Sequence, residues 1–231
     1  MCKYIYISLF SLILFSCKTK EETFDIGADY FPIKPKGSYI IYDVQRIIYG
    51  ASGPDTSNYQ LMEMVGDTAL LNGQLYYKVW RYTRPDASGT WPAQPDSVWE
   101  EYNNTAQAVK IENNRRFVKL VFPVTENKTW NGNVMNTYPS DDYIMQRVGR
   151  SYTVNGHYFP ITLKVVQGND TSLVNEDQRY EVYAKGIGLV DKYINTVLLC
   201  SNASCISAKI TSNKDSIIGG IRYRQKFISY Q

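Results

Sequence analysis

The sequence contains a single histidine, His157, and no G-x-S-x-G or similar nucleophile motif accompanies it. Its adjacent carboxylate pairs, Glu100-Glu101 and Asp141-Asp142, are expected to point to opposite faces of a strand, so neither pair can act on one substrate. Gly186-Ile187-Gly188 is not followed by a helical pattern and therefore lacks a phosphate-binding helix N-terminus. We therefore expect a protein that is not an enzyme and uses no cofactor. The possibility that carboxylates from different strands come together in one site stays open.

The chain also lacks a large excess of positive or negative charge. Lys and Arg total 25 and Asp and Glu total 22, without the clustered basic residues that nucleic-acid binding requires. We find no sustained helical period and, after residue 17, no long apolar run. Tyrosine is abundant instead, with 20 residues, and it favours strands and surfaces that are partly exposed to water. The composition predicts a β protein that does not bind nucleic acid.

The first 17 residues carry the clearest signal. Lys3 precedes the apolar run Tyr4 to Phe15, and Leu14-Phe15-Ser16-Cys17 ends it. This pattern resembles a bacterial lipobox, which implies that residues 1–16 are a lipoprotein signal peptide and that Cys17 carries the lipid, including palmitate. The alternatives are a retained membrane helix, for which the run is shorter than the roughly 20 residues needed, or ordinary secretory cleavage. The expected partner is a membrane, reached through the lipid.

Lys18-Thr19-Lys20-Glu21-Glu22 follows the cysteine and resembles the surface-export signal of Bacteroidota lipoproteins. The resemblance implies attachment to the outer membrane with the protein exposed at the cell surface. The alternative is a solvated tether on a protein that faces the periplasm. We expect residues 17–28 to be a lipidated tether and residues 29–231 to form a single domain.

Two cysteines remain after the signal and the lipid site, Cys200 and Cys205. The four polar residues between them form a turn that brings the sulfurs together, so a disulfide is expected in an oxidising compartment. A metal pair is the rival interpretation. It lacks a second cysteine pair, and His157 is distant in sequence, so we expect no metal.

Alternating apolar and polar residues predict strands throughout the chain. Asn72-Gly73, Asn113-Asn114 and Asn155-Gly156 predict tight turns, and Gly50 to Asn58 predicts a longer one. The pattern places Lys119 on the face opposite Val118, Leu120 and Phe122, and it places Phe159, Ile161, Leu163 and Val165 on one face. The predicted strands cover residues 38–49, 59–65, 75–82, 97–102, 106–112, 115–122, 143–154, 158–167, 179–185, 189–199 and 217–230.

Hairpin-length links between these strands predict an all-β fold, a single antiparallel meander curled into an open or partly closed barrel. A β-sandwich is the alternative. Phe31-Pro32 followed by Gly37-Ser38-Tyr39, and the later segment Tyr183 to Val190, resemble segments of uncharacterised Bacteroidota lipoproteins. That resemblance implies a mostly β, open-barrel-like domain without an assigned activity.

Two tryptophans lie in long predicted connections and are candidate ligand-binding residues. Trp91 lies between prolines in residues 84–95, and Trp130 lies in residues 123–140. Either could stack on a sugar ring, although Trp91 could instead cover the rim of the sheet. We therefore expect a carbohydrate or another envelope ligand. The alternatives are a carrier of a lipid or apolar ligand in the curled sheet, and a structural component of an envelope protein complex.

Three segments match the D-[ST]-apolar acceptor pattern of O-glycosylation in extracytoplasmic Bacteroidota proteins. They place candidate modification sites at Thr68, Ser97 and Ser216. About one match is expected by chance in a chain of this composition.

Overall fold

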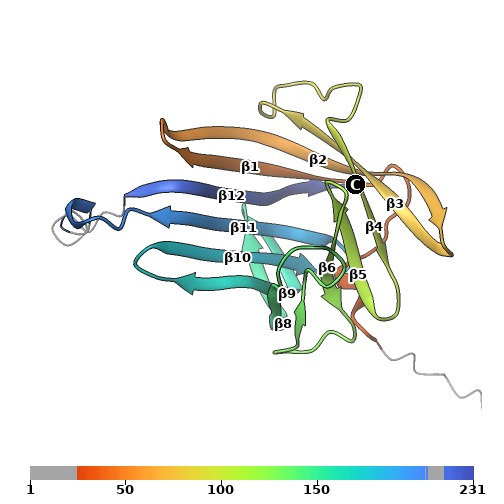
Figure 1. Cartoon of the computed structure of the whole chain (residues 1–231). Helices are drawn as coiled ribbons and strands as arrows, with labels where there is room; N and C mark the ends of the chain where they lie inside the picture. The colour runs from red at the N-terminus through yellow and green to blue at the C-terminus, as the bar shows by residue number, and fades with distance from the viewer. Residues whose placement is uncertain (1–24, 206, 208–215) are drawn as a thin grey trace, which may run out of the picture.

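The computed structural model describes residues 25–205, 207 and 216–231, and nearly all regular structure in this part of the chain is β (Figure 1). The lipobox and Cys17 lie outside the described residues. Within them, no helix is long and apolar enough to cross a membrane. A short 3-10 helix, η1 (Ala28–Tyr30), precedes the strands β1 (Tyr39–Gly50), β2 (Gly53–Leu71), β3 (Gln74–Arg84), β4 (Ser97–Asn103), β5 (Gln107–Glu112), β6 (Arg115–Val121), β7 (Thr129–Asn131), β8 (Asp142–Val154), β9 (His157–Thr171), β10 (Asn175–Ala184), β11 (Gly188–Leu199) and β12 (Ile217–Tyr230).

The strands form one antiparallel sheet in the order β6-β5-β4-β3-β2-β1-β12-β11-β10-β9-β8-β7. Only β1 and β12 are neighbours out of sequence order, so the chain meanders from the middle of the sheet to one edge and returns from the other. The two edges meet at a seam, where Val118 N–H donates to the Gly132 carbonyl at 3.0 Å. The fold is therefore a nearly closed barrel with one unsealed seam. This confirms the predicted curled meander.

The asparagine turns form as predicted. Asn72-Gly73, Asn113-Asn114 and Asn155-Gly156 all have positive φ at both positions, with values between 47° and 78°. Asparagine and glycine tolerate this region of backbone space, and a two-residue turn of that hand matches the twist of the flanking strands. Each turn therefore fixes the register of one hairpin.

The predicted turn from Gly50 to Asn58 is wrong. The chain reverses at Ala51-Ser52, and β2 runs on from Gly53 for 19 residues. Residues 53–59 pair with β1 only, because pairing with β3 begins at Gln60. Pro54 is tolerated there because the free edge needs no hydrogen bond from it. The Asp, Thr, Ser and Asn residues that suggested a turn lie on both faces of an exposed edge strand.

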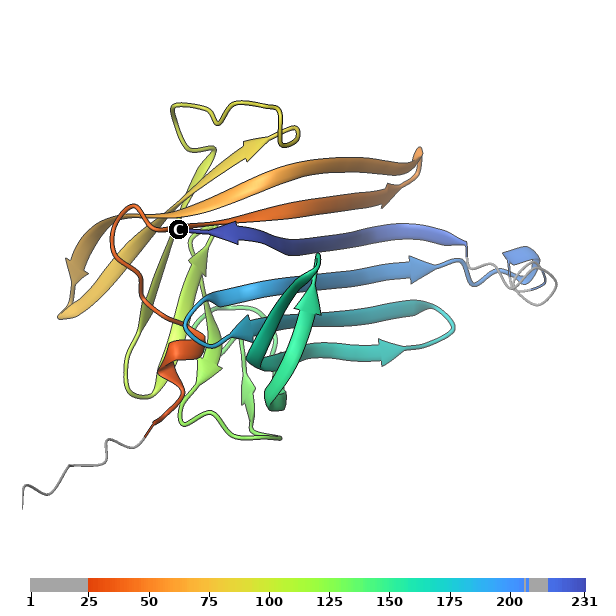
Figure 2. The same ribbon diagram turned by 180° about the vertical axis from the view of Figure 1, so that it is seen from behind.

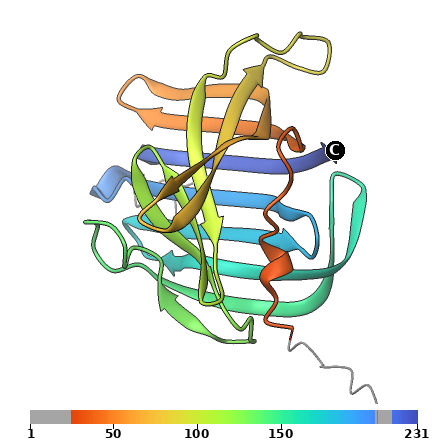
Figure 3. The same ribbon diagram turned by 90° about the vertical axis from the view of Figure 1, so that its right-hand side faces the viewer.

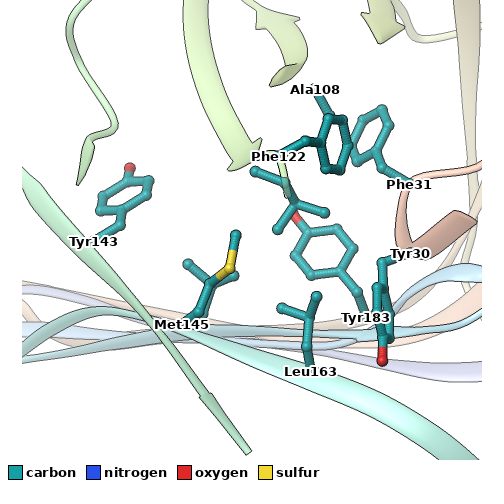
Figure 4. Packing of buried hydrophobic residues seen from close by; sticks show 10 residues of the cluster. Tyr30, Phe31, Ala108, Phe122, Tyr143, Met145, Leu163 and Tyr183 are labelled. Atoms are coloured by element: carbon teal, nitrogen blue, oxygen red, sulfur yellow. The ribbon is translucent and has the colours of Figure 1, made fainter. Parts of the chain in front are cut away.

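The main hydrophobic core fills one end of the barrel. The N-terminal segment with η1 crosses this end (Figure 3), and Tyr30 and Phe31 pack inward from it. Even Ile26 and Ala28, in the expected tether, pack against the core. Figure 4 shows the core residues, which come from strands on both sides of the seam: Tyr30, Phe31, Ala108, Leu120, Phe122, Tyr143, Met145, Leu163, Val165 and Tyr183. Their packing holds the unsealed edges together.

Simple alternation fails in β6. The register shifts between Ala108 and Val109, so that Ala108 faces Leu120 while Val109 faces Val118. Leu120 joins the main core, Lys119 forms an ion pair with Glu181 inside the barrel, and Val118 belongs to a different cluster. The prediction that Lys119 lies opposite Leu120 is therefore wrong. A bulge lets two consecutive side chains share a face.

The β8–β9 hairpin bends over the opposite face of β10 and β11 (Figure 2). Register shifts between Gln146 and Tyr152 produce the bend, with positive φ at Arg147 and Gly149. A second cluster forms beneath the hairpin from Val154, Phe159, Val182, Ala184, Val190 and Phe227.

The bend separates the predicted apolar face of β9. Leu163 and Val165 belong to the main core, whereas Phe159 belongs to the second cluster and Ile161 is 43% exposed. The prediction that all four share one face is therefore wrong. Consecutive residues of β10 confirm that the clusters lie on opposite faces, because Val182 packs in the second cluster and Tyr183 in the main core.

Candidate functional site

Trp130 lies in β7, at the seam. Its indole N–H donates to the Val118 carbonyl at 2.9 Å, and its ring lies edge-on to Tyr143 with centroids 5.7 Å apart. It also packs against two hydrophobic clusters. The side chain is half-buried and links β6 to β7, which leaves it little free ring surface for stacking on a ligand.

Trp91 lies in the loop between β3 and β4 and is half-buried. The Arg84 guanidinium carbon lies 4.2 Å from its ring centroid, and the same guanidinium donates to Gln60 and to the Gly89 carbonyl. An internal cation therefore already occupies one face of the indole.

The predicted disulfide between Cys200 and Cys205 is present, with Cα atoms 5.8 Å apart. Of the three candidate O-glycosylation residues, Thr68 and Ser216 are exposed, whereas Ser97 is half-buried in β4. Among the described residues no cluster of His, Cys, Asp and Glu has the geometry of a metal site.

A group of tyrosines and cations that the sequence did not single out gathers outside the barrel, beside the bent hairpin. Tyr180 of β10 faces Tyr193 of β11, with ring centroids 5.5 Å apart. The Lys164 ammonium lies 4.0 Å from the Tyr180 centroid. The guanidinium carbon of Arg224, on β12, lies 5.7 Å from the Tyr180 ring centroid and 5.5 Å from the Tyr193 ring centroid. We call the site formed by Lys164, Tyr180, Tyr193 and Arg224, with the buried Asp191 paired to Arg224, the tyrosine groove.

Asp191 is a fully buried carboxylate at this site. Its Oδ2 accepts a hydrogen bond from the Tyr152 hydroxyl at 2.5 Å and one from Arg224 at 2.7 Å. Its Oδ1 and the Arg224 Nε are buried and have no hydrogen-bond partner among the described residues. Burial and the hydrogen bond to Asp191 raise the pKa of Tyr152, so this hydroxyl remains a donor. One unpaired acceptor and one unpaired donor are therefore buried at this site.

The space beside the tyrosines has a volume of about 250 Å³. Its walls add amide groups from Gln146, Asn169 and Gln178 to the aromatic rings. Burial, followed by the nearby charge of Arg147, lowers the pKa of Lys164. An anionic group beside Lys164 would relieve this cost. Aromatic faces, amides and an under-compensated cation are suited to binding a polar ligand with flat apolar surfaces.

The interior of the barrel has a different arrangement, in which carboxylates from different strands do come together. Lys110 Nζ lies 2.7 Å from Glu63 and 3.9 Å from Glu101. Lys119 lies 2.8 Å from Glu112 and 3.1 Å from Glu181, and Lys192 lies 3.0 Å from Glu181. Together with Arg81, which lies 3.0 Å from Glu63, these side chains form the interior charge network.

The network shifts its carboxyl groups in opposite directions. Burial raises the pKa of Glu63, but Lys110 and Arg81 outweigh it and bring the pKa down to about 2. Burial raises the pKa of Glu101 to about 7, because Lys110 is too distant to compensate and Glu63 repels a second charge. The pKa of Glu181 is low despite its burial, since Lys119 and Lys192 stabilise the anion.

Sequence reasoning missed both groups for one reason. Tyr180, Tyr193 and Arg224 become neighbours only through the pairing of β10 with β11 and of β11 with β12. Alternation along β11 and β12 separates Tyr193 and Arg224 from Lys192 and Gln225, and this is a signal that the sequence does carry. This alternation does not show which strands pair with each other.

No protein-family model matches the chain, and we find no similar curated protein and no similar solved structure. The proposal below therefore depends on the geometry of the chain itself.

Proposed function

We propose that the protein is a non-catalytic, lipid-anchored protein of the outer membrane that binds a carbohydrate in the tyrosine groove. The observation that carries the proposal is the pair of tyrosine rings that line an open space together with Lys164 and the amide groups of Gln146, Asn169 and Gln178. A sugar presents apolar C–H faces to aromatic rings and hydroxyl groups to polar side chains.

The charge of the groove favours an acidic glycan. Lys164 and Arg224 supply two positive charges against the single carboxylate of Asp191, and Arg147 lies close enough to lower the pKa of Lys164. A carboxylate or sulfate on the ligand would pair with the surplus cation. We therefore expect uronate-containing or sulfated glycans to bind more tightly than neutral ones.

The interior is poorly suited to the alternative ligand, a lipid. Its cavity has a volume of only about 90 Å³, and four lysines and four glutamates are among its lining residues. Placing an acyl chain there would leave charged groups in contact with hydrocarbon, which is costly. The curled sheet therefore favours a polar ligand over an apolar one.

The anchor is tested at Cys17. Cys17→Ala removes the acceptor of the lipid, so the variant should accumulate as uncleaved precursor or leave the detergent phase, as judged by phase partitioning and N-terminal mass spectrometry. A normally acylated N-terminal peptide from that variant would refute the lipobox interpretation.

The ligand is tested on a glycan array run beside a lipid overlay, with the chain from Lys18 onward. We expect binding to acidic glycans, loss of that binding in Arg224→Gln, and no change in Arg115→Gln. Arg115 is a suitable control because it is exposed and contacts Tyr138 in a comparable way, with its guanidinium carbon 4.7 Å from the ring centroid. Binding of lipid without any glycan signal would overturn the proposal.

A further inference from the structure

The cavity inside the barrel reaches the surface at the end crossed by the N-terminal segment. Its lining runs from Glu181, which is 1% exposed, to Tyr230, which is 54% exposed. Phe31 and Pro32 of the N-terminal segment lie along the way. The exposed lining residues Tyr230 and Gln231 lie at the end of β12, so we place the entrance for a solute between this end and the N-terminal segment.

Two buried donors in this cavity have no partner among the described residues, Trp99 Nε1 and Gln225 Nε2. Gln225 is only 3% exposed, and its Oε1 accepts a hydrogen bond from the Tyr223 hydroxyl at 2.8 Å. The amide N–H groups are therefore the free end of this side chain. Buried donors normally have a partner, so both N–H groups are suited to donate to an acceptor that enters the cavity.

Glu101 is the least compensated carboxylate in the same cavity. Glu63, Glu112 and Glu181 each have a lysine nitrogen within 3.0 Å, whereas the nearest to Glu101 lies at 3.9 Å. Its pKa of about 7 reflects this poor compensation. Trp99 and Glu101 are two residues apart in β4 and share a face. The cavity thus combines unsatisfied donors with a carboxylate that lacks a close donor.

Above about pH 7, where Glu101 is ionised, the charges that line the cavity balance, so they do not select an ion of either sign. Lys34, Lys110, Lys119 and Lys192 face an equal number of glutamates. The remaining walls include aromatic and aliphatic side chains such as Tyr42, Val79 and Leu189. A cavity needs roughly 10–15 Å³ to hold one water molecule, so about 90 Å³ can hold several waters or a small organic molecule.

We propose that this interior cavity is a second binding site, separate from the tyrosine groove, for a small neutral polyhydroxylated molecule. Its hydroxyl oxygens accept hydrogen bonds from Trp99 Nε1 and Gln225 Nε2, and a hydroxyl hydrogen is donated to the Glu101 carboxylate. A hydroxyl group does both, whereas a simple ion does only one. The site lies on the opposite face of the sheet from the groove, because Gln225 is next to Arg224 in β12.

The test follows the indole N–H resonances of the ¹⁵N-labelled full chain, kept in detergent so that its N-terminus is retained. Loss of one signal in Trp99→Phe identifies Trp99 among the four tryptophans. The probes are glycerol and erythritol, with glycerate and serinol as charged analogues of similar size. We expect a saturable shift of the Trp99 signal with erythritol, at least tenfold weaker binding of glycerate and serinol, and unchanged erythritol binding in the groove variant Tyr193→Ala.

Two conservative variants complete the test, and both are first checked for native dispersion of their spectra. Gln225→Met removes the amide at similar volume, and Glu101→Gln retains the shape of the carboxyl group. Each should weaken erythritol binding at least fivefold at pH 8. The proposal is overturned if the Trp99 signal moves no more than the other indole signals, if the shift does not saturate, or if the charged analogues bind equally well. Because the readout is in the barrel interior, failure here leaves the groove proposal intact.

Discussion

The two faces of the same strands carry charge in different ways. On the inner face, Lys192 of β11 forms an ion pair with Glu181 inside a network of matched charges. On the outer face, the neighbouring residues Asp191 and Tyr193 belong to a groove in which polar atoms stay unpaired. Matched charges in a buried site hold a structure in one arrangement, whereas unpaired groups at a partly open site are available to a ligand. The comparison ties the stability of the fold to the interior charge network, and our proposal places glycan recognition on the outer face, apart from the small interior site at Trp99 and Gln225.

The largest effect should come from removing the centre of the interior network. Glu181→Ala leaves Lys119 and Lys192 buried without their shared partner, and breaking a buried pair in this way costs about 3–5 kcal/mol. The free energy of unfolding in urea measures it. Asp55→Ala, at an exposed position of β2, is the control and should change stability by less than about 0.5 kcal/mol. Equal stability of the two variants would show that the network does not hold the fold.

A smaller effect should appear as a pH dependence that Glu101 produces. Its pKa rises from 4.5 to about 7 on folding, so between these values the folded state binds more protons than the unfolded state. Stability from this group is therefore highest at low pH and is lost as the pH rises through about 7, by on the order of 1–3 kcal/mol. Glu63 acts in the opposite direction, because its pKa falls to about 2 and its contribution is lost in acid.

Glu101→Gln separates the two contributions, since the amide resembles the protonated carboxyl and does not titrate. The thermal midpoint of this variant should fall less than that of the wild type between pH 5 and pH 8. Parallel pH profiles for the two proteins would count against a neutral Glu101 in the folded state.

The outer carboxylate should matter less for stability. Asp191→Asn removes the charge that faces Arg224, but 31% of the Arg224 side chain is exposed and water can solvate it. The asparagine can still accept a hydrogen bond from Tyr152. We expect a loss of about 1 kcal/mol in unfolding experiments together with weaker glycan binding, because Asp191 positions Arg224. A loss as large as that of Glu181→Ala would remove the distinction between the faces.

The sequence was informative wherever the signal is local. Asn72-Gly73 and Asn155-Gly156 formed the predicted hairpins, and Cys200 and Cys205 are joined. Short turns and a five-residue separation are decided by a few neighbouring residues. The alternating pattern was likewise enough to predict a curled antiparallel meander.

Features that depend on strand pairing could not be predicted in this way. The bulge beside Ala108 turns Lys119 inward, and nothing within β6 alone indicates it. Trp130 was treated as a candidate ligand contact because its partners, Val118 and Tyr143, belong to other segments. The tyrosine groove and the interior network have the same origin, since each assembles residues from three or more strands.

The central claim is tested most directly on two consecutive residues of β11, Lys192 and Tyr193, which lie on opposite faces. Lys192→Met and Tyr193→Ala are each measured by urea unfolding and by titration with the best acidic glycan from the array. We predict that Lys192→Met destabilises the fold by about 2 kcal/mol or more without changing glycan affinity. Tyr193→Ala should weaken glycan binding by about 1 kcal/mol, or roughly fivefold, with a smaller change in stability. The account is contradicted if Lys192→Met reduces glycan affinity as much as Tyr193→Ala does, or if Tyr193→Ala leaves that affinity unchanged.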